Sequence, residues 1–373
     1  TNMNANEVIA NRAIEILGGQ KGDYNLVNPN DHVNFGQSTN DVFPSCGKMA
    51  VLKLIDKAQE QLHRLEAALM EKSKEFDSVI KMGRTQLQDA VPIRLGQEFH
   101  AYASAIRRDI RRFDNAKDEI KSLNLGGTAI GTGLNADVQY FKRVVKNMST
   151  LTGQDLVQSY DMIDATQNLD SYASVSGIVK SCAINLSKMS NDLRLMSSGP
   201  RTGFGEINLP ARQNGSSIMP GKINPVIPEV VNQVAFNIIG NDMTITMAAE
   251  AGQLELNAFE PIIFYNLFQS IETLTFAVKT LIDNCIVGIT ANEEHCRRMV
   301  EESIGIITAI CPYVGYEPAS NIAKEALRTG RSVRDLILER GLMDEEQLNT
   351  ILDPYTMTEP GILGKDPMAK LRE

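Results

Sequence analysis

Five stretches of the sequence repeat apolar residues every three or four positions. They lie near residues 52–69, 95–113, 172–196, 228–238 and 263–285. This spacing places apolar side chains along one face of an α-helix. No convincing run alternates apolar and polar residues, which is the pattern of a half-buried strand. The sequence therefore predicts an all-α fold whose core is a bundle of long helices.

The lengths of the expected elements divide the chain into three parts. Residues 1–40 hold a short helical pattern and a polar loop, and we interpret them as the remnant of an N-terminal domain. Residues 41–294 contain the long helices and form the predicted central five-helix domain. From residue 295 the elements shorten and Gly and Pro become frequent, so 295–373 is predicted to be a small C-terminal helical domain. The apolar stripes are broad for five helices alone, which indicates burial against other chains.

The charge balance of the chain excludes some partners. Its 373 residues include 37 Lys and Arg against 46 Asp and Glu, for a net charge of −9. An acidic balance disfavours non-specific binding to nucleic acid or to an anionic membrane surface. No uncharged apolar stretch approaches the roughly 18 residues that a membrane helix needs. We therefore expect neither a nucleic-acid partner nor a membrane partner.

The cysteines are odd in number and scattered, and none belongs to a Cys-x-x-Cys pair. Most fall on or beside apolar helical patterns, so packing in the core is their default interpretation. Such a set fits reduced thiols better than disulfides or a zinc site. With no signal-peptide pattern, the sequence predicts a cytoplasmic protein. The cysteines are Cys46, Cys182, Cys285, Cys296 and Cys311.

Three polar segments, at 36–41, 83–89 and 215–225, interrupt the helical patterns. Most such segments are ordinary linkers, and Asn40 or Asp41 could simply cap the helix that follows. Together, however, the segments gather neutral hydrogen-bond donors and two cations, a set suited to a carboxylate ligand. The donors are Ser38, Thr39, Asn40, Thr85, Gln86, Ser216, Ser217 and Asn224, and the cations are Arg84 and Lys222.

Other kinds of site are poorly supported. The four histidines lie away from these segments, and no His, Cys or Asp cluster has metal-ligand spacing. The glycine-rich run at 126–135 follows a helical pattern and lacks the Lys-Ser/Thr of a phosphate loop. A site of neutral donors without metal or cofactor suits removal of a proton beside a carboxylate. The resulting aci-carboxylate needs preorganised hydrogen bonds, while Lys222 would hold a second carboxylate and fix the orientation.

The run Gly-Ser-Ser-Ile-Met-Pro-Gly-Lys-Ile-Asn-Pro at 215–225 resembles the signature loop of the aspartase/fumarase superfamily. Four further segments, at 37–41, 83–92, 131–135 and 206–210, resemble family segments in the same order. The resemblance covers essentially the whole chain. It implies a homotetramer in which five long helices from each of four chains form one twenty-helix bundle, with each active site built from three chains.

Within the superfamily the chain is more similar to the ammonia-lyase branch than to the fumarases. Thr39 and Gln86 stand where fumarases usually have Ser and His, and the runs at 164–168 and 208–210 are also typical of the ammonia-lyases. The implied reaction is the reversible deamination of L-aspartate to fumarate and ammonia, without a cofactor or metal. Fumarase activity is the nearest alternative, and a non-catalytic structural protein of the same fold ranks below it.

The resemblance also implies roles for individual residues. Ser216 is the general base that takes the C3 proton, and Asn40 faces the amino group that leaves. The loop 215–225, which includes Met219, closes over the substrate. The β-carboxylate is bound by Ser38, Thr39, Thr85 and Ser217. The α-carboxylate is bound by Lys222 and Asn224, with Gln86 nearby.

Two departures from the family pattern bear on this interpretation. Related enzymes pair a Glu at the position of Glu229 with a His, but Gln86 occupies the partner position. We therefore expect Glu229 to be structural, as a first-turn carboxylate favoured by the helix dipole. The chain also begins at Thr1 on a polar run, where family members have a long preceding segment. We expect that segment to supply a hydroxyl group to the amino end of the substrate.

Overall fold

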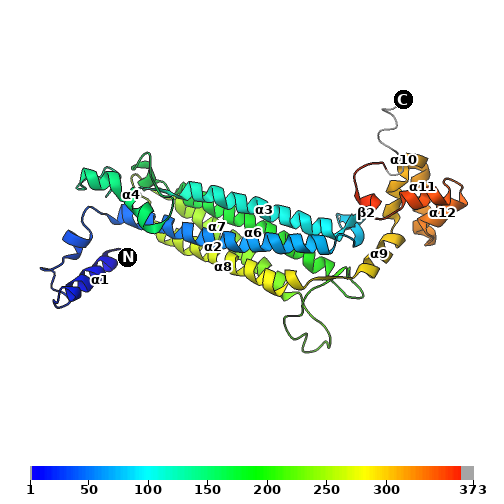
Figure 1. Ribbon diagram of the computed structural model, residues 1–373, viewed down its shortest axis with the longest axis horizontal. Helices are drawn as coiled ribbons and strands as arrows, with labels where there is room; N and C mark the ends of the chain where they lie inside the picture. Colours follow the sequence, from blue (N-terminus) through cyan, green and yellow to red (C-terminus); the bar gives the residue numbers. More distant parts are fainter. Residues whose placement is uncertain (1, 363–373) are drawn as a thin grey trace, which may run out of the picture. The chain divides into compact units, whose positions relative to one another are not determined.

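The computed structural model describes residues 2–362 of the chain. Five helices are much longer than the rest, and they coincide with the five apolar stripes (Figure 1). The predicted all-α class and its long-helix core are therefore confirmed. The long helices are α2 (Thr39–Glu75), α3 (Leu95–Ile120), α6 (Asp170–Met196), α7 (Val226–Glu250) and α8 (Glu260–Asn284).

The chain forms two compact units, and each contains part of every long helix. Unit 1 takes in the chain up to His63 together with Ile106–Ser187 and Val230–Lys279. Unit 2 takes in Arg64–Ala105, Lys188–Glu229 and the chain from Thr280 onward. The division at residues 40 and 294 stays a prediction.

In unit 1, contacts between neighbouring helices join the bundle into a closed ring. Helix α2 contacts α3, α3 contacts α6, and α6 contacts α7. Helix α7 contacts α8, and α8 contacts α2. Burying paired polar groups between helices fixes how the helices align. The contacts are Gln59 to the Ile110 carbonyl at 3.2 Å, Asn185 to Asp109 at 2.9 Å, Ser176 to Asp242 at 2.7 Å, Asn241 to Ser270 at 3.1 Å, and Phe43 to Phe264 with ring centroids 5.0 Å apart.

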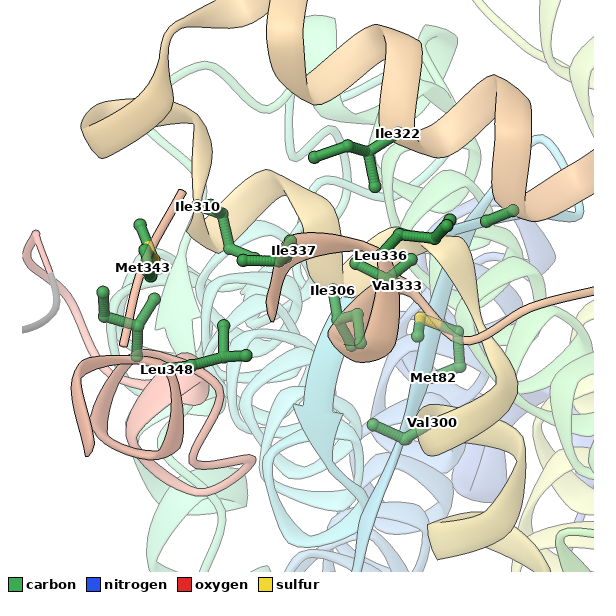
Figure 2. Packing of buried hydrophobic residues seen from close by; sticks show 12 residues of the cluster. Met82, Val300, Ile306, Ile310, Ile322, Val333, Leu336, Ile337, Met343 and Leu348 are labelled. Carbon is green, nitrogen blue, oxygen red and sulfur yellow. The ribbon is translucent and has the colours of Figure 1, made fainter. Parts of the chain in front are cut away.

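Unit 2 has a separate apolar core formed by short C-terminal helices (Figure 2). Ile310, Ile322, Ile337 and Leu348 are each fully buried in this cluster. Met82 joins them from the strand β1 (Ile80–Thr85). This core therefore ties the C-terminal helices to the strand that carries Thr85.

The segment 83–89, expected to be a polar loop, lies instead in a β-hairpin. Strand β1 pairs antiparallel with β2 (Gln88–Arg94), and Thr85 faces Gln88 across the turn. A bulge follows Met82, where a Cβ on Gly83 would meet the Val91 carbonyl at 2.6 Å. Strands this short that carry Gly and Pro show no clear alternation of apolar and polar residues, so their sequence does not predict them.

The remaining elements are short. No helix between residues 2 and 362 combines the length and apolar composition that a bilayer crossing requires. The helices are α1 (Asn2–Ile16), η1 (Pro29–Val33), α4 (Val138–Thr152), α5 (Asp164–Gln167), η2 (Ile286–Gly288), α9 (Glu293–Glu302), η3 (Ile304–Ala309), α10 (Cys311–Val314), α11 (Tyr316–Thr329), α12 (Val333–Glu339), α13 (Glu345–Ile351) and η4 (Thr356–Thr358). The two-residue strands are β3 (Ser122–Leu123), β4 (Val157–Gln158), β5 (Ile207–Asn208) and β6 (Thr290–Ala291).

The close packing of α2 on α8 predicts how adding a side chain at Gly47 changes stability. A Cβ on Gly47 would lie 2.1 Å from the ring of the buried Phe264. We expect Gly47→Ala to lower the free energy of unfolding by about 1–3 kcal/mol, because overpacking shifts the ring and its neighbours. Gly177→Ala is the matched control on α6, where a Cβ meets nothing within 4 Å. It should stabilise by about 0.5–1 kcal/mol, and chemical denaturation measures both. Equal effects of the two substitutions would contradict the packing described.

Candidate active site

The signature loop is exposed and closed at its base by a short backbone contact. The Ser216 N–H donates to the Lys222 carbonyl at 3.2 Å, and the Lys222 N–H donates to the Met219 carbonyl at 3.3 Å. Gly215 permits this closure, since a Cβ there would lie 2.0 Å from the Lys222 carbonyl oxygen. Ser217, Met219 and Lys222 are exposed, whereas Ser216 is half-buried.

The hydroxyl oxygen of Ser216 accepts two hydrogen bonds from the backbone of its own loop. The Ile218 N–H lies 3.2 Å from Oγ, and the Met219 N–H lies 3.1 Å from it. Two convergent N–H groups favour negative charge on the oxygen they contact. The loop therefore forms a small anion-stabilising turn around the one side chain expected to lose a proton.

Ser38, Thr39 and Asn40 lie together in unit 1 at the start of α2. Ser38 caps the helix: its Oγ accepts from the Asn40 N–H at 3.2 Å, and its own N–H donates to Asp41 at 2.9 Å. This reciprocal pair is a capping box. The expectation that Asn40 or Asp41 caps the helix is therefore corrected, because Ser38 occupies the cap and Asp41 is its partner. The Thr39 hydroxyl donates to the Asn2 side chain at 2.7 Å.

Asp41 also anchors the glycine-rich segment beside these residues. Its second oxygen accepts from the Gly126 N–H at 3.0 Å and the Thr128 N–H at 3.1 Å. Burial raises the pKa of Asp41, and the backbone N–H groups partly offset that rise. The Asn40 amide then donates to the Ala129 carbonyl at 2.7 Å. The start of α2 and the 126–129 turn thus form one rigid piece.

Thr85 and Gln86 lie in unit 2 at the tip of the hairpin, and both are exposed. Gln86 and Leu87 form the two-residue turn with φ of 54° and 62°. These left-handed angles belong to a type I′ turn, where Asn and Gly are the favoured residues. Within residues 2–362, no hydrogen bond or ion pair joins Thr85 or Gln86 to the 215–225 loop.

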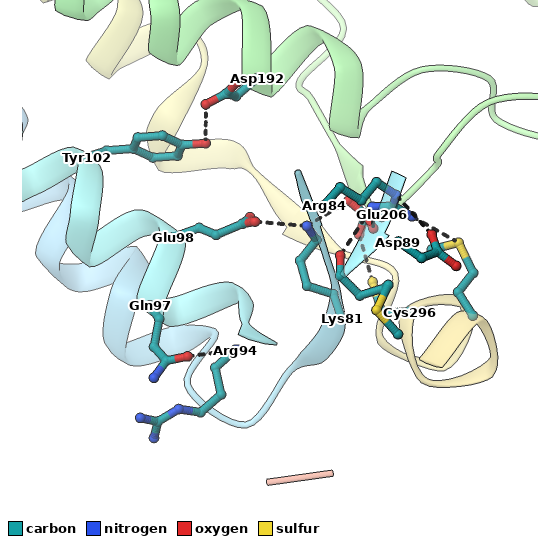
Figure 3. A network of polar contacts seen from close by, with 12 residues as sticks. Lys81, Arg84, Asp89, Arg94, Gln97, Glu98, Tyr102, Asp192, Glu206 and Cys296 are labelled. Atoms are coloured by element: carbon teal, nitrogen blue, oxygen red, sulfur yellow. Dashed lines mark hydrogen bonds and ion pairs between the residues drawn. The ribbon is translucent and has the colours of Figure 1, made fainter. Parts of the chain in front are cut away.

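A network of charged side chains connects the hairpin to Glu206 and Glu98 (Figure 3). The fully buried Glu206 pairs with Arg84 at 2.6 Å and with Lys81 at 3.2 Å. Lys81 also pairs with Glu98 at 2.9 Å, and burial raises the pKa of Glu98. Arg84 lies over the Phe204 ring, 4.1 Å from its centroid. Arg84 is recognisable in the sequence only as a cation of a polar segment, and nothing local to Glu206 marks that residue as its ion-pair partner.

The other expectations about charged groups can also be compared with the structure. Glu229 lies in the first turn of α7, as expected, and pairs with Arg194 at 3.5 Å. Its structural role stays a prediction. Among the described residues, no group of three His, Cys, Asp or Glu side chains could hold a metal ion. The donor set instead provides hydroxyl, amide and amine groups suited to an anionic ligand.

Comparison with known proteins agrees with this donor-rich, long-helix arrangement. The sequence matches the family described as lyase over residues 1–240 and the fumarase C C-terminus over residues 306–359. It is 55% identical to an aspartate ammonia-lyase of Bacillus subtilis (strain 168), covering 99% of this chain and 78% of that protein. It is 53% identical to an aspartate ammonia-lyase of Helicobacter pylori (strain ATCC 700392 / 26695), covering 96% and 77%.

Solved structures share the fold. A fumarate lyase:delta crystallin from Brucella melitensis bound to cobalt superposes with a TM-score of 0.93 at 52% identity, covering 96% of this chain and 78% of that one. A class II fumarase from Schistosoma mansoni gives a TM-score of 0.93 at 35% identity, covering 96% and 78%. The fold and its donor-lined loops are therefore those of a lyase of the aspartase/fumarase superfamily. The chain shares 53–55% of its residues with the two aspartate ammonia-lyases above. It therefore belongs to the aspartate ammonia-lyase family, whose members are carbon–nitrogen lyases.

The anchoring role of Asp41 predicts a loss of stability on removing one carboxylate oxygen. Asp41→Asn should lower the free energy of unfolding by about 1–3 kcal/mol, because a buried N–H group loses its acceptor. Asp137→Asn is the matched control, since Asp137 caps α4 at an exposed site. Asn caps helices as well as Asp does, so the control should change stability little. Denaturant unfolding of both variants measures the difference, and equal stabilities would contradict the anchoring role.

Proposed function

We propose that the protein catalyses the reversible deamination of L-aspartate to fumarate and ammonia. The observation that carries this proposal is the pair of N–H groups on Ser216 Oγ, at 3.2 Å and 3.1 Å. An isolated serine hydroxyl is too weak an acid to serve as a base. Hydrogen bonds to its deprotonated form make that form accessible, which is what proton abstraction from carbon requires.

In the proposed reaction, the Ser216 alkoxide takes the C3 proton of L-aspartate. The electrons of that C–H bond move into the adjacent β-carboxylate, giving the aci-carboxylate. They then return to form the C2–C3 double bond as the C2–N bond breaks and ammonia leaves with the bonding pair. Ser216 finally releases its proton to solvent, and the reverse sequence adds ammonia to fumarate.

The substrate-binding roles proposed for the remaining residues follow their chemistry. Hydroxyl groups of Ser38, Thr39, Thr85 and Ser217 would donate to the β-carboxylate, where charge develops. Lys222 and Asn224, with Gln86 nearby, would hold the α-carboxylate and fix the orientation of the C3–H bond. Asn40 would face the amino group, and the exposed loop with Met219 would close over the substrate.

The experiment that tests the activity is direct. Purified protein is mixed with L-aspartate, and fumarate is followed by its ultraviolet absorbance while ammonia is measured separately. L-malate in place of L-aspartate tests the fumarase alternative, which the more distant 35% identity to a fumarase supports less. Turnover of malate alone would replace the proposal, and turnover of neither would favour a non-catalytic protein of this fold.

Replacement of the proposed base gives a sharper test. Ser216→Ala should lower kcat by about 10²–10⁴-fold, because general-base catalysis contributes that much. Affinity for a dicarboxylate inhibitor should change little, because the carboxylate donors remain. Ser217→Ala is the comparison: it removes a β-carboxylate donor and keeps the base, so it should weaken the dicarboxylate inhibitor as well as lower kcat. Initial rates and inhibition constants separate the two variants, and normal turnover by Ser216→Ala would refute its role as base.

The proposed assembly is a homotetramer with each active site shared between three chains. Large apolar side chains on α7 and α8 are exposed in the single chain, which supports burial against further copies. Soluble chains seldom leave so many long apolar side chains in water. The most exposed are Phe236 at 63%, Met243 at 63% and Met247 at 62% on α7, with Tyr265 at 66% and Phe276 at 65% on α8. A cytoplasmic location is also proposed, supported by five free cysteines.

A charge placed on this face tests the assembly. Phe236→Glu should dissociate the tetramer and abolish activity, because a buried unpaired carboxylate opposes association. Tyr160→Glu is the control, since Tyr160 is fully exposed and belongs to neither helix. Light scattering after size-exclusion chromatography gives the mass of each variant. A Phe236→Glu variant that keeps the mass and activity of the parent would contradict an interface at this position.

A further inference from the structure

A cavity of about 260 Å³ lies beside the start of α2 in unit 1. Thr39 and Asn40 line it on one side, and Glu260 and Pro261 line it on another. Phe43 and the segment 256–258 complete the wall. Two of the proposed substrate-binding residues therefore share a cavity with a carboxyl group that the sequence did not single out.

Glu260 is the first residue of α8 and is only 7% exposed. Within the described part of the chain, no hydrogen bond or ion pair engages its carboxyl group. Lys48 is the cation that lowers the pKa of Glu260 electrostatically. Its ammonium group, however, donates its hydrogen bond to the Ser122 carbonyl at 2.7 Å. Glu260 thus presents a buried acceptor with no fixed partner to the cavity.

Burial of the Glu260 carboxyl group lowers the stability of the folded chain at neutral pH. Burial raises the pKa of Glu260 to about 8, although Lys48 lowers it in part. The folded chain therefore keeps the proton over a pH range in which the unfolded chain has lost it, so stability falls as pH rises from about 4.5 to about 8. Glutamine would fill the same space without this loss. A destabilising carboxyl group in a cavity is typical of a functional position.

L-Aspartate carries two carboxylates and one ammonium group. The proposed donors bind the carboxylates, and among the proposed side chains Asn40 alone faces the ammonium group. The ammonium needs acceptors. Asn40 has one side-chain acceptor, its Oδ1, while its Nδ2 donates to the Ala129 carbonyl at 2.7 Å. Among the side chains lining this cavity, Glu260 is the one carboxylate. A cation bound next to it would favour its ionised form.

We propose that Glu260, together with Asn40, binds the ammonium group of L-aspartate and thereby selects an amino substrate over its hydroxyl analogue. The inference rests on the proposed function, because it assigns the remaining charged group of that substrate. A hydroxyl group in the same place would lack the positive charge that an ionised carboxylate prefers, so malate would bind less well.

Glu260→Gln tests the assignment, because glutamine keeps the shape and removes the charge. Binding of L-aspartate is compared with binding of succinate, which has the same two carboxylates and no amino group. Loss of a charge-assisted hydrogen bond should weaken L-aspartate binding about 10- to 100-fold. Succinate binding should stay within about twofold, and KM for ammonium in the reverse reaction should rise in parallel with the loss for L-aspartate. Glu255→Gln, an exposed carboxylate in the same connection, is the matched control.

Folding of the variant is checked by thermal unfolding and light scattering, and removal of a buried acid should leave it at least as stable as the parent. Equal weakening of L-aspartate and succinate would overturn the proposal and leave Glu260 a structural counter-charge to Lys48. Unchanged L-aspartate affinity would overturn it as well. If the parent protein fails to convert L-aspartate, the proposed function itself falls, and this inference falls with it.

Discussion

Two buried carboxylates hold the irregular segments of this protein in place. Asp41 accepts backbone N–H groups from Ser38, Gly126 and Thr128 in unit 1. Glu206 pairs with Arg84 and Lys81 of the hairpin in unit 2. A buried charge destabilises the fold unless it is paired and hydrogen-bonded. The folded state therefore keeps the donors of each carboxylate in a fixed arrangement. Those arrangements position Ser38, Thr39 and Asn40 in one unit and Thr85 and Gln86 in the other.

The long helices cannot supply such donors along their length, because their N–H and C=O groups bond to each other. Free N–H groups occur at helix ends and in turns. The polar groups of the candidate site lie there: at the cap of α2, in the hairpin turn, and in the loop that precedes α7. The polar groups of the candidate site are therefore confined to the connections between the long helices.

This division explains what could be predicted from the sequence. Helical periodicity is local, so the stripes at 52–69 and 263–285 gave α2 and α8 without knowledge of their neighbours. The hairpin was missed because a bulge at Gly83 and a proline at 92 break its short alternation. Glu206 and Glu260 were missed for a different reason. Arg84 and Glu206 are 122 positions apart, and the cavity of Glu260 joins α2 to α8, so only tertiary packing shows the role of either acid.

Three other polar groups of unit 2 are poorly suited to the role of base that we propose for Ser216. Gln86 is a neutral amide and accepts no proton at ordinary pH. Glu229 forms an ion pair with Arg194 at 3.5 Å. The Nε2 of His295 donates to the Phe204 carbonyl at 2.9 Å. The oxygen of Ser216, the proposed base, already meets two N–H groups of a turn, and a turn can offer such groups without burying any charge before the substrate arrives.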